Sequence, residues 1–169
     1  MRAGVALGSN LSDRLQHLRM ARQAIVELVG VTPPVLASAI YETEPVDCEE
    51  GAGKFLNAVI EFGYEGKPAH LWQRLRHIEA SLGRPGQHAR NVSRKIDLDL
   101  LYFANMKIEE GDLQLPHPRM HLRSFVLQPL ADIRADLILP GQTKTVRELL
   151  ASLAQSARVE RLTNNWNPE

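Results

Sequence analysis

The 169-residue sequence lacks the features that would tie it to a disulfide framework, a membrane or a nucleic acid. Its only cysteine, Cys48, can form no disulfide within the chain, which fits a reducing compartment. Lys plus Arg and Asp plus Glu both number 20, so no net charge attracts the whole chain to nucleic acid or an anionic membrane. No run of about 18 apolar residues could span a bilayer, and Met1 to Leu7 is too short for a signal peptide. We therefore expect a cytoplasmic protein without a membrane partner.

Hydrophobic residues make up 44% of the chain, which is enough for one compact core. A chain of 169 residues leaves no room for a second domain of ordinary size. Residues 1–169 are therefore expected to form a single domain, which we expect to act as a monomer.

Hydrophobic periodicity, interrupted by turn residues, predicts alternating strands and helices. The predicted strands cover 3–7, 36–41, 55–62 and 96–103. A first helix should be capped by Ser12 or Asp13 and closed by Gly30, and a second should run from Pro68 to Gly83. Shorter helices are predicted at 124–133 and 146–153. The order strand, helix, strand, strand, helix, strand predicts an α+β fold, a ferredoxin-like α/β sandwich with helices packed on an antiparallel sheet.

The main chemical feature is the run Ile96-Asp97-Leu98-Asp99-Leu100 in the last of these strands. Because side chains alternate along a strand, Asp97 and Asp99 face one way, side by side, and the apolar residues face the other. Two neighbouring carboxylates repel each other unless a cation lies between them. Their oxygens suit Mg²⁺ that carries substrate phosphates. The alternative is the solvated outer face of an amphipathic edge strand.

The segment 84–95, directly before this strand, is predicted to be a basic loop. It contains five basic residues and no acidic one: Arg84, His88, Arg90, Arg94 and Lys95. Cations here could hold the oxygens of phosphates whose metal is bound by the two aspartates. The alternative is an exposed loop that charge keeps in solvent. The acidic, glycine-containing segment 44–54 is also predicted to be a loop.

Glu79, Phe55 and Phe125 have ordinary explanations when each is taken alone. Glu79 lies three residues after Arg76 in the second helix, where a surface ion pair is the default. The two phenylalanines are candidates for the hydrophobic core.

His117 lies between Pro116 and Pro118 in a predicted extended loop. There it could present its ring to a ligand, and with Arg119 and Arg123 it could close on a polyphosphate from the side opposite the basic loop. A single loop histidine is more often only polar surface.

Several of these segments occur together in one order, and together the sequence resembles the 6-hydroxymethyl-7,8-dihydropterin pyrophosphokinase family from about Val5 to Pro140. The resemblance is carried by Gly8-Ser9-Asn10, Asn57-Ala58, the run from Arg94 to Leu101, and the runs from Leu115 to Met120 and from Arg123 to Leu127.

The resemblance implies an enzyme that transfers pyrophosphate from MgATP to the hydroxymethyl group of the reduced pterin and releases AMP, in folate biosynthesis. Asp97 and Asp99 would bind two Mg²⁺ ions that bridge the ATP phosphates. Arg84 and Arg94 would reach the reacting phosphates when the loop that carries them closes. The nucleotide site would also include Glu79, His117 and Arg123.

The resemblance implies a pterin pocket in which Phe55 and Phe125 sandwich the ring and Asn57 reads its polar edge. A flat heterocycle gains most from stacking combined with a few directed hydrogen bonds. The full set of implied pterin residues is Thr43, Pro45, Val46, Phe55, Asn57 and Phe125. Positioning and charge stabilisation would do the catalytic work, because the family uses no side-chain nucleophile.

Four positions depart from the family pattern. Asn91 stands where many relatives have a tryptophan that covers the pterin, and Glu44 stands where a proline is common. Asp112 and Pro118 replace an arginine and a tyrosine of some relatives. These differences concern the loop and the ATP contacts rather than the two aspartates.

Two other classes compete with this interpretation. Nucleotidyltransferases also combine Gly-Ser with Asp-x-Asp, but there the pair follows the turn closely, whereas about ninety residues intervene here. A ferredoxin-like nucleic-acid-binding module would need exposed strand aromatics, and this neutral chain has 5% aromatic residues. We therefore expect small-molecule partners, ATP and the pterin, and no nucleic acid.

Overall fold

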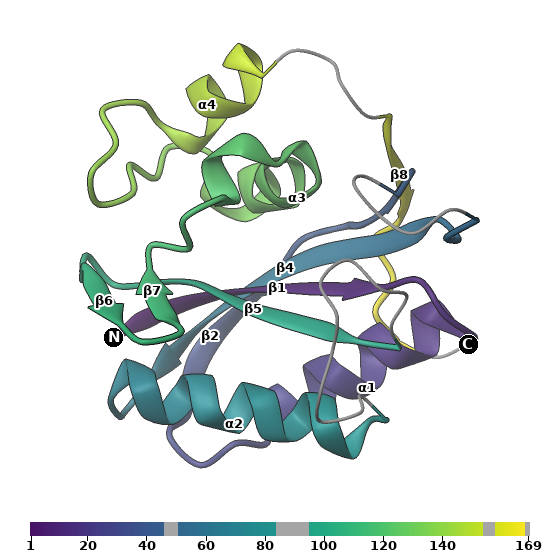
Figure 1. Ribbon diagram of the computed structural model, residues 1–169, viewed down its shortest axis with the longest axis horizontal. Helices are drawn as coiled ribbons and strands as arrows, with labels where there is room; N and C mark the ends of the chain where they lie inside the picture. Colours follow the sequence, from purple (N-terminus) through teal and green to yellow (C-terminus); the bar gives the residue numbers. More distant parts are fainter. Residues whose placement is uncertain (46–50, 84–94, 154–157, 168–169) are drawn as a thin grey trace.

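The computed structural model describes residues 1–45, 51–83, 95–153 and 158–167. Its centre is a six-stranded sheet in the order β5-β1-β4-β3-β8, with β2 also paired to β4. In Figure 1, helices α1 and α2 cover one face of the sheet and α3 and α4 lie over the other. The α+β ferredoxin-like arrangement is confirmed.

The first half of the chain contributes β1 (Arg2–Ser9), α1 (Arg14–Val26), β2 (Val31–Ala37), β3 (Ile40–Thr43), β4 (Phe55–Tyr64) and α2 (Pro68–Ser81). The second half contributes β5 (Asp97–Phe103), the hairpin of β6 (Ile108–Glu110) and β7 (Leu113–Leu115), a 3-10 turn η1 (Met120–Leu122), α3 (Ser124–Arg134), α4 (Val146–Ser152) and β8 (Val159–Thr163). Within the described residues, no helix has the length and apolar character needed to cross a membrane.

Local sequence signals account for most helix ends. The Asp13 side chain accepts a hydrogen bond from the Gln16 amide and so caps α1. Pro68 occupies the first turn of α2, where its missing N–H costs nothing. Thr145 and Glu148 form a reciprocal capping box at the start of α4.

The sheet separates two hydrophobic clusters. One packs β1, β4 and β5 against α1 and α2 through residues such as Leu7, Leu18, Ile60 and Leu75. The other lies between the sheet and α3 with α4, and contains Val59, Leu127 and Leu130. Alternation along the strands therefore assigns each side chain to one cluster or the other.

The three central strands have a register that matters for the site. Gly8 of β1 lies opposite Asn57 of β4 on one side and Asp97 of β5 on the other. Four residues away, Gly4 lies opposite Glu61 and Tyr102 in the same way. Between these rows β5 has a bulge, because Gly4 pairs with Tyr102 and Val5 with Leu100, which leaves Leu101 as an extra residue.

The predicted single strand over 36–41 is wrong in its bounds, since β2 and β3 are separate strands. Buried Ser38 lies at the break, where its hydroxyl accepts from the Val59 amide (2.9 Å) and donates to the Ala39 carbonyl (2.6 Å). A side chain thus takes the place of a ladder bond, and hydrophobic periodicity carries no sign of that substitution.

Candidate active site

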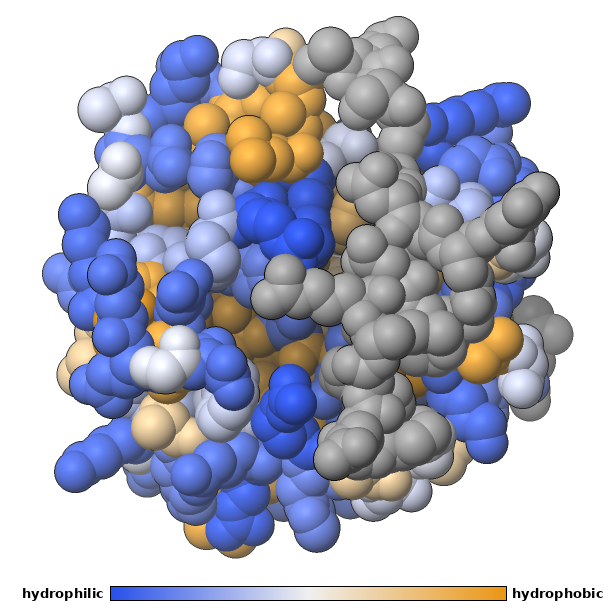
Figure 2. Space-filling model, viewed as in Figure 1, coloured by the Kyte–Doolittle hydropathy of each residue, from blue (hydrophilic) through white to orange (hydrophobic). Residues whose placement is uncertain are grey.

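An open cavity lies between the sheet and the N-terminal end of α3. The space inside it is about 720 Å³ when the part continuous with solvent is counted. Its walls come from β1, β3, β4, β5 and α3, with these lining residues: Ala6, Leu7, Gly8, Thr43, Glu44, Phe55, Asn57, Ala58, Asp97, Asp99, Arg123, Phe125 and Val126. Figure 2 shows apolar surface recessed between strongly hydrophilic side chains on this face of the molecule.

Asp97 and Asp99 both line the cavity, as their predicted alternation on β5 requires. Leu98 and Leu100 are buried in the cluster under α1 and α2, while the two aspartates are half-buried on the opposite face. An Asp99 carboxylate oxygen lies 3.9 Å from Nη1 of Arg123. The pair therefore faces a concave site that also contains a cation, which is unlike a plain solvated strand face.

Glu79 does not form the surface ion pair expected by default. Its side chain is 1% exposed, and its Oε1 accepts a hydrogen bond of 2.8 Å from the backbone amide of Leu98. Leu98 lies between the two aspartates, and β5 is at the edge of the sheet formed by the described residues, so no strand among them offers this amide a ladder partner. Glu79 therefore fixes the backbone of the aspartate segment from α2, and it is not among the residues that line the cavity.

The polar floor of the cavity is built around Gly8. Asn57 is buried on β4, and its Nδ2 donates to Thr43 Oγ1 on β3 (2.7 Å). This bond occupies the NH₂ end of the amide, so Oδ1 is the end that remains on the Gly8 side. A Cβ on Gly8 would lie 3.3 Å from Asn57 Oδ1, so glycine keeps the space between Asn57 and Asp97 open.

Phe55 and Phe125 lie at the cavity wall rather than inside the core, and both are half-buried. Phe55 begins β4 and Phe125 lies in the first turn of α3. The guanidinium carbon of Arg123 is 5.5 Å from the Phe125 ring centroid. Arg123 thus connects an aromatic wall with the aspartate pair.

His117 lies outside the lining of this cavity, beside a second hollow that includes Pro116, Pro118 and His121. Its backbone amide donates to the Leu101 carbonyl of β5 (2.7 Å), and its Nδ1 accepts from the Arg119 amide (3.2 Å). Burial, together with the charges of Arg123 and Arg119, lowers the pKa of His117 to about 4. The ring is therefore neutral near pH 7, and its proton is on Nε2.

The structure brings together seven of the site residues expected from the sequence: Thr43, Phe55, Asn57, Asp97, Asp99, Arg123 and Phe125. Pro45, Glu79 and His117 do not line the cavity. Val46, Arg84 and Arg94, and with them Asn91, lie outside the described residues. Sequence reasoning missed Ala6 and Ala58 as wall residues, since small apolar side chains in a strand carry no chemical signal.

Comparison with known proteins identifies the family. The model of the 7,8-dihydro-6-hydroxymethylpterin-pyrophosphokinase (HPPK) family matches residues 4–135. The chain belongs to the HPPK family. It is 43% identical over 131 residues to a 2-amino-4-hydroxy-6-hydroxymethyldihydropteridine pyrophosphokinase of Bacillus subtilis, covering 78% of this chain and 77% of that one. The corresponding enzyme of Haemophilus influenzae is 34% identical over 158 residues, covering 94% and 96% of the two chains.

Solved structures of the family have the same fold at low sequence identity. A crystal structure of an HPPK-DHPS in complex with substrates aligns with 89% of this chain at a TM-score of 0.71 and 14% identity. The wild-type HPPK-DHPS of Plasmodium falciparum with pterin and p-hydroxybenzoate aligns with a TM-score of 0.69 and 16% identity. This HPPK chain spans 42% of the length of each of these two chains.

Proposed function

We infer that the cavity beside α3 is the active site in which this HPPK-family chain transfers pyrophosphate from ATP to 6-hydroxymethyl-7,8-dihydropterin, a step of folate biosynthesis. The observation that carries the assignment is the position of Asp97 and Asp99, which face the same cavity as Phe55, Asn57 and Phe125. One pocket thus offers ligands for a phosphate-bound metal next to a slot for a flat heterocycle.

The pterin ring is proposed to lie between Phe55 and Phe125, with one edge toward Asn57. Offset stacking on two half-buried aromatic rings favours a flat ligand. The Asn57 amide is held by Thr43, so its oxygen is presented to an N–H donor of the ring without a conformational search. Pro45 and Val46 remain proposed pterin contacts from the adjoining loop.

Asp97 and Asp99 fit the requirements of Mg²⁺, and we propose that they hold two Mg²⁺ ions together with the ATP phosphates. Among the described residues, no group of three or more His, Cys, Asp or Glu forms a protein-only metal cage. Two half-buried carboxylates in a phosphate site match a hard cation that keeps water and substrate oxygens as its other ligands. When bound, the metal would offset the negative charge of the polyphosphate.

The chain's own cations are proposed to orient the polyphosphate. Arg123 lies in the cavity wall between Asp99 and Phe125, where it can reach a phosphate without leaving the aromatic wall. The neutral His117 can donate from Nε2 to a nucleotide oxygen without bringing in another charge. Arg84 and Arg94 remain proposed as residues that contact the reacting phosphates.

Glu79 is proposed to belong to the nucleotide site through the backbone. By accepting from the Leu98 amide it holds the segment that presents both carboxylates. A residue that orients metal-binding side chains in this way normally has a large effect on metal affinity and activity.

In the proposed reaction, the hydroxymethyl oxygen of the pterin attacks the β-phosphorus of ATP. The bond between the β-phosphorus and the oxygen shared with the α-phosphate breaks, AMP leaves with that oxygen, and the hydroxyl proton is released. Arg123 and the loop arginines stabilise the charge on the transferred group.

We also propose that residues 1–169 form one domain that acts as a monomer. We propose that it works in the cytoplasm, because a chain with one cysteine suits a reducing compartment.

The product identifies the reaction. The protein is incubated with MgATP and 6-hydroxymethyl-7,8-dihydropterin, and the nucleotide product is resolved by chromatography. We expect AMP in equal amount to the pterin diphosphate and only with the pterin present. ADP would indicate a simple kinase, and free pyrophosphate would indicate nucleotidyl transfer; either result would overturn the assignment.

A further inference from the structure

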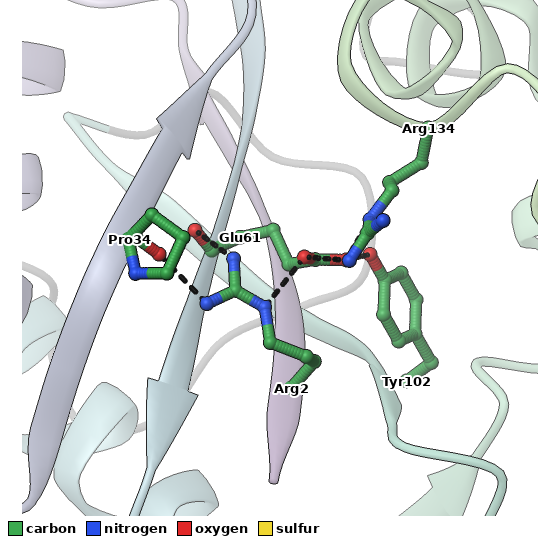
Figure 3. Close-up of polar contacts among 5 residues, drawn as sticks. All are labelled: Arg2, Pro34, Glu61, Tyr102 and Arg134. Carbon is green, nitrogen blue, oxygen red and sulfur yellow. Dashed lines mark hydrogen bonds and ion pairs between the residues drawn. The ribbon is translucent and has the colours of Figure 1, made fainter.

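A second polar cluster lies on the same face of the sheet, away from the cavity. Glu61 is 1% exposed, and its two carboxylate oxygens receive four hydrogen bonds. Arg2 Nε and Arg134 Nη2 donate to Oε1 at 2.7 and 2.8 Å, while Arg134 Nε and the Tyr102 hydroxyl donate to Oε2 at 2.8 and 2.5 Å. Figure 3 shows the three side chains converging on Glu61, with Arg2 also bonded to the Pro34 carbonyl. We call Arg2, Glu61, Tyr102 and Arg134 the Glu61 cluster.

The strands are shaped to make this cluster possible. The bulge at Leu101 turns Tyr102 toward the α3 side, so that Leu101 and Tyr102 both pack in that cluster of the core. Gly4 provides the space for the ring, since a Cβ there would lie 2.3 Å from Tyr102 Cε1. Three strands therefore cooperate to bring the phenol to the buried carboxylate.

Each member of the Glu61 cluster comes from an element that also lines the cavity. Arg2 is on β1, Glu61 on β4, Tyr102 on β5 and Arg134 on α3. The same elements carry Gly8, Asn57, Asp97 and Phe125 at the cavity. The row of Glu61, Gly4 and Tyr102 lies four residues along β1 from the row of Asn57, Gly8 and Asp97, which is about 13 Å at the rise of a strand.

Helix α3 is held differently at its two ends. Its last turn is fixed by Arg134 on Glu61 and by Asp132, which accepts from the Tyr41 hydroxyl and the Ala39 amide. At its first turn no side chain caps the helix, and Phe125 lies against the cavity. The anchored end therefore contributes to how far the cavity end stands from the sheet, together with Val126 and Leu127, which pack the start of the helix into the core.

We propose that the Glu61 cluster is a positioning device for the substrate pocket. It holds α3 at a fixed height above β1, β4 and β5 and so sets the gap between Phe125 and the sheet, where the pterin ring is proposed to stack. Burying a carboxylate with two guanidinium groups adds little net stability compared with apolar packing, but its bidentate bonds allow only one geometry. This inference rests on the proposed pterin pocket.

The test measures pterin affinity in variants that loosen the cluster without touching the pocket. Tyr102→Phe removes one donor, and Arg134→Met removes the helix anchor while keeping an apolar stem. The matched control is Asp13→Ala, which removes the α1 cap on the opposite face of the sheet. Binding of 6-hydroxymethyl-7,8-dihydropterin is measured by calorimetry with Mg²⁺ and a nonhydrolysable ATP analogue, at a temperature where every variant is folded.

We expect Tyr102→Phe and Arg134→Met each to raise the pterin Kd about threefold to tenfold, the range for loss of one aromatic stacking contact. Asp13→Ala should leave the pterin Kd within about twofold of the unmutated value, even if its Tm falls as far as the Tm of the two cluster variants. Pterin affinity that follows Tm regardless of the variant would overturn the inference, as would unchanged affinity in both cluster variants. If Tyr102→Phe does not fold, the pterin Kd of Arg134→Met alone tests the inference, because Arg134 is partly exposed and its replacement is tolerated more easily. Failure of the unmutated protein to bind the pterin would instead overturn the proposed pocket, and this inference with it.

Discussion

At the scale of single residues, the site depends on carboxylates with opposite environments. Asp97 and Asp99 are half-buried at a cavity, whereas Glu79 and Glu61 are buried and bonded to donors of the protein. The first pair lines the cavity, and the other two act on the geometry of the protein. Substitutions should separate these roles.

Removal of one charge from the aspartate pair should abolish turnover but not folding. Asp97→Asn and Asp99→Asn keep the size of the side chain and relieve repulsion between neighbouring carboxylates. Loss of the 3.9 Å contact between Asp99 and Arg123 should cost at most about 1 kcal/mol. Activity and Tm are compared with Asp136→Asn, a change at an exposed surface pair. An active Asp97→Asn enzyme would exclude this residue from the metal site.

Glu79 should matter through the oxygen that it offers to Leu98. Glu79→Gln can keep that hydrogen bond, whereas Glu79→Leu leaves a buried amide without an acceptor. We expect Glu79→Leu to raise the Mg²⁺ concentration for half-maximal activity about 10- to 100-fold, and Glu79→Gln to restore most of the loss. Deuterium exchange at the Leu98 amide gives a reading independent of activity. Equal behaviour of the two variants would show that the charge, and not the hydrogen bond, is what counts.

At the scale of elements, the break between β2 and β3 depends on one hydroxyl. Ser38→Ala leaves the Val59 amide without its acceptor inside the sheet, which should cost about 1 to 3 kcal/mol of unfolding free energy. Ser81→Ala is a matched control, because the Ser81 hydroxyl only donates to a carbonyl at the end of α2. Urea denaturation of both variants measures the difference. A similar small loss in both would mean that Val59 finds another acceptor, such as water.

The elements also show how far sequence reasoning reaches. Periodicity and caps predicted α1, α2, α3 and α4, and the alternation of Asp97 and Asp99 with apolar residues predicted which way they face. Strand β8 was missed, because Val159–Thr163 is mostly polar and has no alternating pattern. The Glu61 cluster was missed as well, since its partners come from positions 2, 102 and 134 and meet only through register and a bulge.

At the scale of the whole molecule, Glu61 should make stability depend on pH. Burial alone would raise the pKa of Glu61, but hydrogen bonds from Arg134, Tyr102 and Arg2 lower it below its ordinary value near 4.5. A folded pKa below the unfolded one means that the unfolded chain binds the proton more readily, so this stabilisation is complete above about pH 4.5 and is lost as the pH falls through the lowered pKa.

Thermal unfolding of the unmutated protein and of Glu61→Gln, followed from pH 7 down to pH 3, measures this contribution. The Tm difference between them should be largest at neutral pH and should shrink in the acidic range. Asp136→Asn, at an exposed position, is the control and should show little change in its difference. A Tm difference that is constant over the range would show that the charge of Glu61 does not contribute.

The position of β1 between β4 and β5 has a consequence for how the protein folds. Gly8 pairs with Asn57 and with Asp97, so the floor of the cavity joins segments separated by much of the chain. The Gly8–Asp97 contact spans more of the chain than the Gly8–Asn57 contact, so the loop that it closes is longer and costs more entropy to close. During synthesis on the ribosome, β1 can pair with β4 before β5 has been made, but Asp97 and Asp99 join the site only when β5 pairs with β1. The site is therefore completed late in folding, and an incomplete chain has no site that could bind and consume ATP.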